Sequence, residues 1–342
     1  RGPEARALWQ EARALDRDAA AELAGAERAV VARAEVVLAT CTGCDHPLVD
    51  AEPFACVVID EAGQAPDPIA LIPLARAPVA VLAGDPMQLG PVVQTDGPAR
   101  AVLASTMFAR LVGAAPGPGP DATVMLEQQH RMHARIMAFP SRSMYGGRLR
   151  AAPAVAAHTL EQLAVAADPL RPGPLWLIDT AGTDWRDQRA DELADDGPAL
   201  DPSTFNPGHA DRVAAEARRL LSRGLPPTEL AIIVAYAAQA RRLRALLAAE
   251  RAAGVEVGTV DGFQGREKEA VIVDLVRSNE RGELGFLADT RRMNVALTRA
   301  RRFLLVVADS STLGDHPYYA ALIGYLDELD AHGSAWSDDA PP

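Results

Sequence analysis

Short runs of apolar residues recur along the chain and are separated by polar or helical stretches. Runs this short are typical of parallel strands that are buried on both faces. The runs occupy residues 36–39, 56–59, 79–83, 124–126, 175–178, 230–234, 270–276 and 303–307. Helical stretches lie between several of them, at 210–223, 237–251 and 290–301. Strands that alternate with helices predict an α/β fold of doubly wound architecture.

The first 35 residues depart from this pattern and predict a long helix. They are rich in alanine, and Leu8, Leu15, Leu23 and Val30 recur at a spacing of about seven residues. A stripe this narrow favours a helical stalk over 1–35 that packs against a neighbour.

A glycine- and proline-rich break at 113–121 divides the rest of the chain. Such a break is typical of a hinge between two folded units. We therefore expect a first unit at 36–115, a hinge linker at 116–121, a second unit at 122–330 and an acidic tail at 331–342.

The composition fits a two-domain protein that does not span a membrane. The chain has 342 residues, 49% of them hydrophobic, and no apolar stretch reaches the ~18 residues that cross a bilayer. No signal peptide is visible, and three cysteines are too few for a disulfide framework, so we expect a cytoplasmic protein. The first residue is Arg rather than Met, which indicates a piece of a longer polypeptide.

The charge distribution leaves a nucleic-acid partner open. A net charge of −12 argues against such a partner. However, the acidic residues cluster at 179–201 and near the C-terminus, whereas 289–302 is basic. The charge of the whole chain is therefore weak evidence about its partner.

Two adjacent carboxylates, Asp60 and Glu61, follow the apolar run 56–59. Ligands of open α/β sheets bind outside the carboxyl ends of the strands. This position suits an Asp60 that holds hydrated Mg²⁺ and a Glu61 that polarises an attacking water. A strand that simply exits into solvent with a charged pair explains the same residues equally well.

A second polar loop, GDPMQLGPVV, follows the run 79–83. Gln88 in this loop suits contact with a γ-phosphate or its attacking water, and Asp85 suits a role in fixing the loop. Taken alone, a Pro/Gly turn with an incidental Gln is the better explanation.

Two arginines are candidates for phosphate contacts from the second unit. Arg131 comes just after the hinge, and Arg299 is expected on a helix that runs into the strand at 303–307. An arginine offered to phosphates bound on another unit stabilises transition-state charge, which is worth roughly 10³–10⁵ in rate. A solvated basic face is the alternative for either residue.

A glycine-flanked loop at 257–267 carries polar residues suited to a ligand. Thr259, Asp261, Gln264 and Glu267 are placed to contact phosphates, ribose or the neighbouring unit. Alone, this loop is a signal of moderate strength.

Six segments, taken together and in order, resemble the motifs of superfamily 1 helicases. The resemblance is to the branch that contains the nonsense-mediated-decay RNA helicase and the immunoglobulin-mu-binding helicase. The segments are ATCTGCD, IDEAGQ, GDPMQLGPVV, QQHRMH, TVDGFQGREKE and RRMNVALTRARR. The resemblance implies two RecA-like P-loop NTPase lobes, the first incomplete, preceded by a helical stalk. It also implies ATP and Mg²⁺ as cofactors and single-stranded DNA or RNA as partner.

The resemblance implies a catalytic role for five matched residues. Asp60 would bind Mg²⁺ through water, Glu61 would act as the catalytic base, and Gln88 would sense the γ-phosphate. Arg131 and Arg299 would contact the phosphates from the second lobe.

Further matched residues would bind ligands. Glu267 would lie near the nucleotide ribose, and Asp85 and Gly265 belong to the nucleotide-binding motifs. Thr42 and Thr259 are the candidates for contact with the nucleic-acid backbone. The sequence departs from the family at His130, where the family usually has a tyrosine next to the adenine.

The phosphate loop of the family, G-x-x-G-x-G-K-[ST], is missing from the sequence. The sole lysine is Lys268, and no glycine cradle precedes it. Because the five catalytic candidates are all present, we expect the C-terminal part of an ATP-dependent helicase whose loop lies upstream in the same polypeptide. We expect such a fragment to be inactive alone. The alternative is a non-enzymatic nucleic-acid-binding or scaffold remnant of a helicase.

Cysteine and histidine positions give weaker signals. Cys41 and Cys44 with His46 suggest a zinc site, but a single Cys-x-x-Cys pair is weak evidence and Cys41 falls inside the first motif. The histidines without a partner pattern are expected at the surface or at helix caps; they are His133, His158, His209 and His316.

Overall fold

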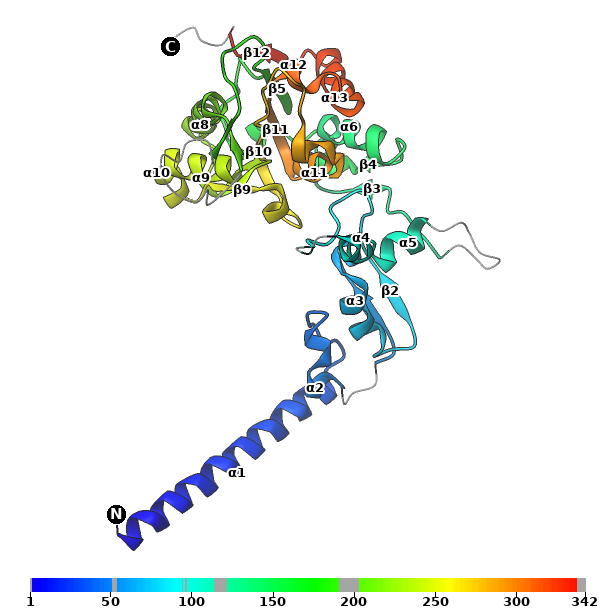
Figure 1. Cartoon of the computed structure of the whole chain (residues 1–342), viewed down its shortest axis with the longest axis vertical. Coiled ribbons are helices and arrows are strands. Elements are labelled where there is room, and N and C mark those ends of the chain that lie inside the picture. Colours follow the sequence, from blue (N-terminus) through cyan, green and yellow to red (C-terminus); the bar gives the residue numbers. More distant parts are fainter. Residues whose placement is uncertain are drawn as a thin grey trace. The chain divides into compact units, whose positions relative to one another are not determined.

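A computed structural model describes residues 2–50, 54–93, 95, 97–113, 122–190 and 203–336. The chain divides into two compact units (Figure 1). The first comprises Arg1–Pro86 and Gly90–Asp121, and the second comprises Met87–Leu89 and Ala122–Pro342. The hinge linker expected at 116–121 lies outside the described residues.

The N-terminal stretch forms the predicted helix, α1 (Pro3–Arg33). Pro3 suits the first turn, because its missing N–H would have no partner there. The helix has no buried residue, and its stripe residues Leu8, Leu15, Leu23 and Val30 are 62–66% exposed. The stripe therefore faces solvent in the described part of the chain.

The rest of the first unit is built on a two-stranded parallel sheet. Strands β1 (Val57–Ile59) and β2 (Ala80–Leu82) pair from Val57–Ala80 to Ile59–Leu82. The accompanying helices are α2 (Pro47–Asp50), α3 (Asp67–Leu74), α4 (Pro98–Ala104) and α5 (Met107–Gly113). Val58 is 65% and Val81 50% exposed, so the described residues leave part of this sheet uncovered.

The second unit contains a six-stranded, all-parallel sheet in the order β12-β5-β11-β10-β8-β9. Its strands are β5 (Leu175–Asp179), β8 (Leu230–Val234), β9 (Glu256–Thr259), β10 (Lys268–Asp274), β11 (Ala300–Ala308) and β12 (His332–Ser334). Two-residue strands form a parallel pair, β3 (Gln128–Gln129) and β4 (Arg150–Ala151), and an antiparallel pair, β6 (Gln188–Arg189) and β7 (Thr204–Phe205).

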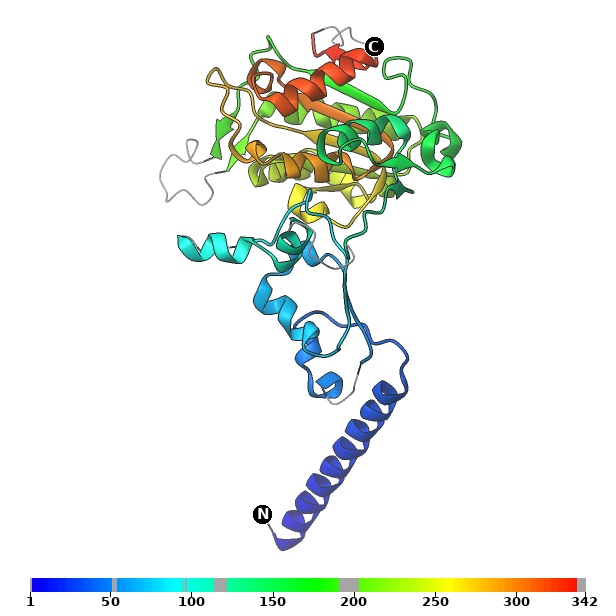
Figure 2. The same cartoon turned by 90° about the vertical axis from the view of Figure 1, so that its right-hand side faces the viewer.

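Helices cover both faces of this sheet. They are α6 (Ala134–Met144), α7 (Pro153–Ala156), α8 (Pro207–Ser222), α9 (Ala237–Leu246), α10 (Ala248–Ala252), α11 (Thr290–Leu297), α12 (Ser310–Leu313) and α13 (Pro317–Glu328). Figure 1 shows α8 and α9 on one face, and Figure 2 views the unit from the opposite face, with α6 and α13 in front of the strands.

Successive residues of a strand therefore enter different cores. Ile233 packs in the core beneath α6, α11 and α13, whereas Ile232 packs in the core beneath α8 and α9. Both are 0% exposed, which explains why the run at 230–234 is apolar throughout. The predicted α/β architecture with a parallel sheet is confirmed.

The sequence pattern failed at several strands, and it also missed the two-residue strands β3, β4, β6 and β7. The expected strands at 36–39 and 124–126 are wrong, because these residues lie in irregular backbone without a strand neighbour, and Leu38 is 93% and Leu126 83% exposed. Conversely, β9 and β12 were missed, because neither Glu256–Thr259 nor His332–Ser334 is an apolar run. Strand β12 lies within the range expected as an acidic tail, so the folded sheet extends beyond residue 330.

None of the described helices combines the length and the apolar character that crossing a membrane requires.

Candidate active site

Asp60 and Glu61 occupy the turn directly after β1, and both are exposed. The buried Ile59 anchors the strand, and the Glu61 N–H donates to Asp60 Oδ1 at 2.9 Å. Glu61 Oε2 accepts a hydrogen bond from Gln64 Nε2 at 3.0 Å. The turn therefore holds two carboxylates at the surface, at the edge of a parallel sheet where ligands bind.

Glu61 has a left-handed backbone, with φ 52° and ψ 38°. A residue with a side chain pays of order 1–3 kcal/mol for such a conformation, and strain of this kind clusters at functional sites. The Ala62 N–H, which donates to the Ala83 carbonyl at 2.8 Å, fixes the turn against the neighbouring strand end. The strained turn at Glu61 is therefore tied to the end of β2 and held in place at the edge of the sheet.

The loop after β2 runs beside this turn. A Cβ on Gly84 would lie 3.0 Å from the Gly63 backbone nitrogen and 3.1 Å from the Phe108 ring, so a larger residue would push the two loops apart. Asp85 follows Gly84, and its carbonyl oxygen lies 3.5 Å from the position of a Cβ on Gly63. Asp60, Glu61 and Asp85 thus leave neighbouring strands at one edge.

Gln88 belongs to a segment that groups with the second unit, Met87–Leu89. The Met87 carbonyl accepts a hydrogen bond from Asn294 Nδ2 at 2.8 Å, and the Leu89 carbonyl accepts one from Gln264 Nε2 at 3.4 Å. Leu89 is buried in the core of the second unit. Asp85 and Gln88, three residues apart in sequence, therefore belong to different units.

Arg131 and Glu267 form an ion pair on the second unit, through Arg131 Nε and Glu267 Oε2. Arg131 Nη1 also donates to the Thr298 carbonyl at 3.2 Å, and Arg301 Nη1 donates to Glu267 Oε1 at 2.9 Å. Glu267 therefore lies between two guanidinium groups. About a third of the Arg131 and Glu267 side chains is exposed (32% and 36%), so the pair remains accessible to a ligand.

The two arginines set the charge state of Glu267. Burial alone raises the pKa of this carboxyl, but the hydrogen bond and charge of Arg131, with the charge of Arg301, outweigh burial and hold the pKa below its ordinary value. Glu267 is therefore an anion at neutral pH, which keeps the Arg131 guanidinium oriented.

The sequence predicts Arg299 on a helix, and this prediction is wrong. Helix α11 ends at Leu297 and β11 begins at Ala300, so Arg299 occupies the turn between them. It is 2% exposed. Its guanidinium donates to the carbonyls of Val295 at 2.9 Å and Arg266 at 3.2 Å, and to Thr298 Oγ1 at 3.0 Å. In this conformation Arg299 fixes the turn of the TVDGFQGREKE loop at Arg266.

The remaining predicted residues lie on separate elements. Thr42 is exposed before a short 3₁₀ turn, with its Oγ1 3.3 Å from Thr40 Oγ1. Thr259 ends β9, and Gly265 has a left-handed backbone at φ 76°. His130 is exposed next to Arg131. Thr42 belongs to the first unit and the others to the second.

Several residues that shape the second unit were not found from the sequence. Thr259 lines a cavity of about 430 Å³ together with Tyr236, Phe286 and Arg292. Thr259 and Asp261, which also lines the cavity, were candidates from the sequence, but Tyr236 and Phe286 were not.

The expected placement at the surface or at helix caps is confirmed for His133 and His316, the N-caps of α6 and α13. It is wrong for His158 and His209, which are 4% and 0% exposed and cap no helix.

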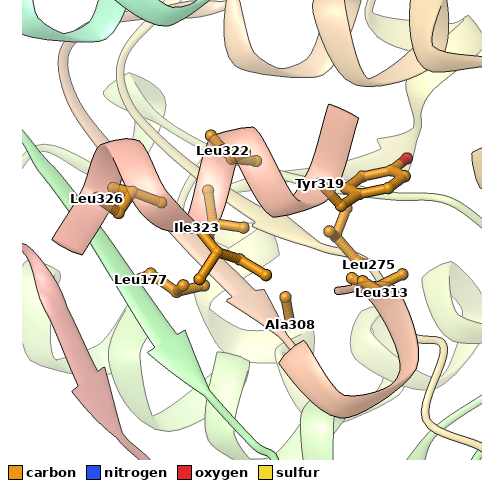
Figure 3. Close-up of a pocket in the computed structure, with 9 residues that line it drawn as sticks. Leu177, Leu275, Ala308, Leu313, Tyr319, Leu322, Ile323 and Leu326 are labelled. Atoms are coloured by element: carbon orange, nitrogen blue, oxygen red, sulfur yellow. The ribbon is translucent and has the colours of Figure 1, made fainter. Parts of the chain in front are cut away.

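The described residues support neither a metal site nor an enclosed cavity that could hold a ligand. Among the described residues, no three or more His, Cys, Asp or Glu are grouped as a metal site would need. A cavity of about 10 Å³ between β5, β11 and α13 is lined only by the apolar side chains of Figure 3 and Tyr319. A space of this size holds at most one water and has no polar partners for it.

Models of known families match most of the chain. A model described as an AAA domain matches residues 103–311, and another with the same description matches residues 1–96. DNA-binding protein SMUBP-2 of Mesocricetus auratus is 41% identical over 300 residues, which cover 86% of this chain and 29% of that protein.

Two further relatives have similar coverage. DNA polymerase alpha-associated DNA helicase A of Schizosaccharomyces pombe is 37% identical over 313 residues, 91% of this chain and 46% of that protein. A regulator of nonsense transcripts 1 homolog of Drosophila melanogaster is 33% identical over 307 residues, 88% of this chain and 24% of that protein. The chain spans less than half the length of each of these relatives.

Proposed function

The chain belongs to the superfamily 1 helicases, in the group of SMUBP-2 and regulator of nonsense transcripts 1, and from this premise we propose that it is part of an ATP-dependent helicase or translocase. Its nucleic-acid substrate is single-stranded DNA or RNA. The observation that carries the proposal is the exposed Asp60–Glu61 pair, on a strained turn at the carboxyl edge of a parallel sheet.

On the first unit, Asp60 holds hydrated Mg²⁺ and Glu61 polarises the attacking water. The donors fit the ion, because Mg²⁺ prefers carboxylate oxygens and keeps several waters. When bound, Mg²⁺ neutralises charge on the phosphates. Asp85, beside the same turn, supports the nucleotide loop. Gln88, in the segment that groups with the second unit, senses the γ-phosphate.

On the second unit, Arg131 and Arg299 are the phosphate-contacting arginines, and Glu267 lies near the ribose. Arg131 is the better placed of the two, because part of its guanidinium side chain is exposed and Glu267 orients it. Arg299 is buried and donates to backbone carbonyls, so it also supports the loop that carries Gly265 and Glu267.

The phosphate loop is supplied by an upstream part of the same polypeptide. Two observations support this. The sole lysine, Lys268, is engaged elsewhere, 2.9 Å from Glu256 Oε1 and bonded to the Thr228 carbonyl. The valines at the centres of β1 and β2 are half exposed or more, as expected of a sheet whose face further elements of the polypeptide would cover. The chain alone therefore hydrolyses ATP negligibly.

Thr42 on the first unit and Thr259 on the second contact the sugar-phosphate backbone of the single-stranded nucleic acid. Binding that depends on phosphates is salt-dependent and poor in sequence preference. The strand therefore binds tightly at low salt and with little regard to its sequence.

The test is ATP hydrolysis by the natural full-length polypeptide, with and without a single-stranded oligonucleotide. Glu61→Gln keeps the shape of the exposed side chain and removes its basicity, so we expect turnover to fall by about 10²–10⁴-fold with ATP binding retained. Glu35→Gln changes an exposed carboxylate of the same unit outside the site and leaves turnover unchanged.

Two results would overturn parts of the proposal. Full-length protein that does not hydrolyse ATP would indicate a helicase remnant: a nucleic-acid-binding one if it binds a strand, and a scaffold if it does not. Strand-stimulated hydrolysis by residues 1–342 alone would refute an upstream phosphate loop.

A further inference from the structure

A cavity of about 430 Å³ opens at the carboxyl ends of β8 and β9. Its volume lies in the range of small-molecule sites, ~300–1,000 Å³. Tyr236 follows β8, Thr259 ends β9, and Phe286 and Arg292 come from the segment before and within α11. The cavity therefore sits where open α/β sheets bind ligands.

Phe286 is 58% exposed, although aromatic side chains of this size are usually highly buried. Its ring centroid lies 5.5 Å from that of Tyr236. The Tyr236 hydroxyl fixes the loop, since it donates to the Leu284 carbonyl at 3.2 Å and accepts from the Phe286 N–H at 3.3 Å. The exposed ring is thus held by specific contacts.

Gly285, in the same loop, occupies a position where no larger residue would fit. Its backbone is left-handed at φ 56°, and a Cβ there would lie 2.6 Å from Tyr236 Oη and 2.8 Å from Arg277 Nη1. Only glycine permits both the turn and the approach of the tyrosine hydroxyl. The loop therefore presents Phe286 to the cavity in one defined position.

Arg292 packs against the Phe286 ring at the side of the cavity. Its guanidinium carbon lies 5.3 Å from the Phe286 ring centroid, and Nη1 donates to the Phe286 carbonyl at 3.3 Å. Asp289 lies 3.8 Å from the same guanidinium. The arginine therefore presents a flat, partly neutralised surface beside the exposed ring.

The charges of the cavity favour an uncharged aromatic ligand over a phosphate. Arg292 lies 3.8 Å from Asp289, which pairs more closely with Arg291 at 2.9 Å, and the carboxylate of Asp261 lines the cavity beside Arg292. A phosphate beside Arg292 would also meet the carboxylate of Asp261, whereas an uncharged ring would not be repelled by it. A nucleobase gains from stacking on Phe286 and Arg292, at about 1–3 kcal/mol per base by alanine substitution.

We propose that this cavity holds one unstacked base of the single strand against Phe286, with Arg292 beside it. The inference rests on the proposed function and goes beyond it, because it assigns a base-stacking subsite to residues outside the predicted backbone contacts. Thr259, at the same cavity, places the backbone contact next to the stacked base.

The experiment uses the natural full-length polypeptide and a fluorescent single-stranded oligonucleotide. Phe286→Ala raises the Kd roughly 10- to 100-fold, the fold-change that corresponds to the loss of one stacked base. The slope of log Kd against log salt concentration stays unchanged, because no phosphate contact is lost. Phe286→Leu weakens binding similarly, whereas Phe286→Tyr restores it.

Trp336→Ala is the matched control. Trp336 is also an exposed aromatic of the second unit, at 63%, and does not line the cavity, so its removal leaves the Kd unchanged. An oligonucleotide with a single 5-iodouracil adds a direct readout, since irradiation cross-links it to the peptide that carries Tyr236 or Phe286.

The outcomes separate this inference from the proposed function. If the wild type binds strands and Phe286→Ala binds equally well, or if Trp336→Ala loses as much affinity, the subsite is refuted and the helicase proposal stands. If the wild type binds no strand, both fail. Thermal unfolding of each variant identifies a loss of affinity caused by misfolding, which would also count against the subsite.

Discussion

Asn294 Nδ2 lies 2.8 Å from the carbonyl oxygen of Met87, although 207 residues separate the two. The same amide donates to Tyr145 Oη at 2.8 Å, and Asn294 is fully buried. Met87 immediately precedes Gln88. A buried side chain of α11 therefore holds the backbone next to the proposed γ-phosphate sensor.

Replacing this amide tests the connection. Asn294→Ala leaves the Met87 carbonyl without its donor, so we expect a loss of about 1–3 kcal/mol in unfolding free energy. We also expect faster amide exchange at residues 87–89, measured by hydrogen–deuterium exchange and mass spectrometry. Arg291→Ala, at a half-exposed position of the same helix, should leave that exchange unchanged; equal effects from both variants would contradict the connection.

The Glu267 cluster gives a kinetic prediction. Glu267→Ala removes the partner of both Arg131 and Arg301. Because the pair is about a third exposed, its loss costs only about 0–1 kcal/mol of stability. Turnover of the full-length polypeptide should nevertheless fall about tenfold, since misplacing a positioned catalytic group carries a large penalty. ATP hydrolysis at saturating ATP measures this.

The control for Glu267 is another surface ion pair of the same unit. Glu250→Ala breaks the pair between Glu250 and Arg218, whose atoms lie 2.6 Å apart, and should leave turnover unchanged because neither residue contacts Arg131 or Glu267. If the two variants have equal activity, Glu267 does not position Arg131.

Much of the second unit could be predicted because its strands are buried on both faces. The run at 230–234 must be apolar, and so it is recognisable. Edge strands such as β12 pair on one side only and carry no such pattern. The runs at 36–39 and 124–126 are equally apolar, but an apolar segment becomes a strand only where a neighbour pairs with it.

The candidate site divides in the same way. Motif order picked out Asp60, Glu61 and Arg131, which all lie outside the helices and strands, because the residues of a loop motif are close together in sequence. It could not show that Arg299 is buried, since its hydrogen-bond partners include a carbonyl 33 residues away. Phe286 escaped notice for the same reason, because its exposure depends on Tyr236, 50 residues earlier.

A buried network that no local pattern reveals joins His209, Asp274 and Thr180. His209 Nδ1 lies 2.9 Å from Asp274 Oδ1, and Nε2 lies 2.9 Å from Thr180 Oγ1. All three residues are 0% exposed, so the arrangement resembles a catalytic triad but no substrate can reach it. It stabilises the carboxyl end of β10.

We expect His209→Ala to destabilise the chain by about 1–3 kcal/mol, because it leaves the buried Asp274 side chain with one hydrogen-bond partner fewer. Urea unfolding followed by circular dichroism measures the change. Asp211→Ala breaks an exposed pair with Arg242, 3.9 Å apart, and should cost no more than about 1 kcal/mol. If His209→Ala also costs less than about 1 kcal/mol, the buried network does not stabilise the chain.

Asp309 makes stability depend on pH. This carboxylate is 2% exposed, and burial alone raises its pKa. Hydrogen bonds from Ser278 Oγ at 2.6 Å, from Ser311 and from Thr312 outweigh burial and lower the pKa below its ordinary value. Because the unfolded chain then binds the proton more readily, the stabilisation is complete above the ordinary aspartate pKa of about 3.9 and is lost as pH falls through the lowered value.

Asp309→Asn removes the charge and keeps the shape. At pH 6 to 7 the variant should be less stable than the wild type by about 1–3 kcal/mol, because hydrogen bonds to a charged acceptor are lost. The difference should begin to shrink only below about pH 4 and continue to shrink as the wild-type carboxylate is protonated. Thermal unfolding of both proteins from pH 7 to pH 3 measures it, and a difference that stays constant over this range would show that the hydroxyl groups do not stabilise the charge of Asp309.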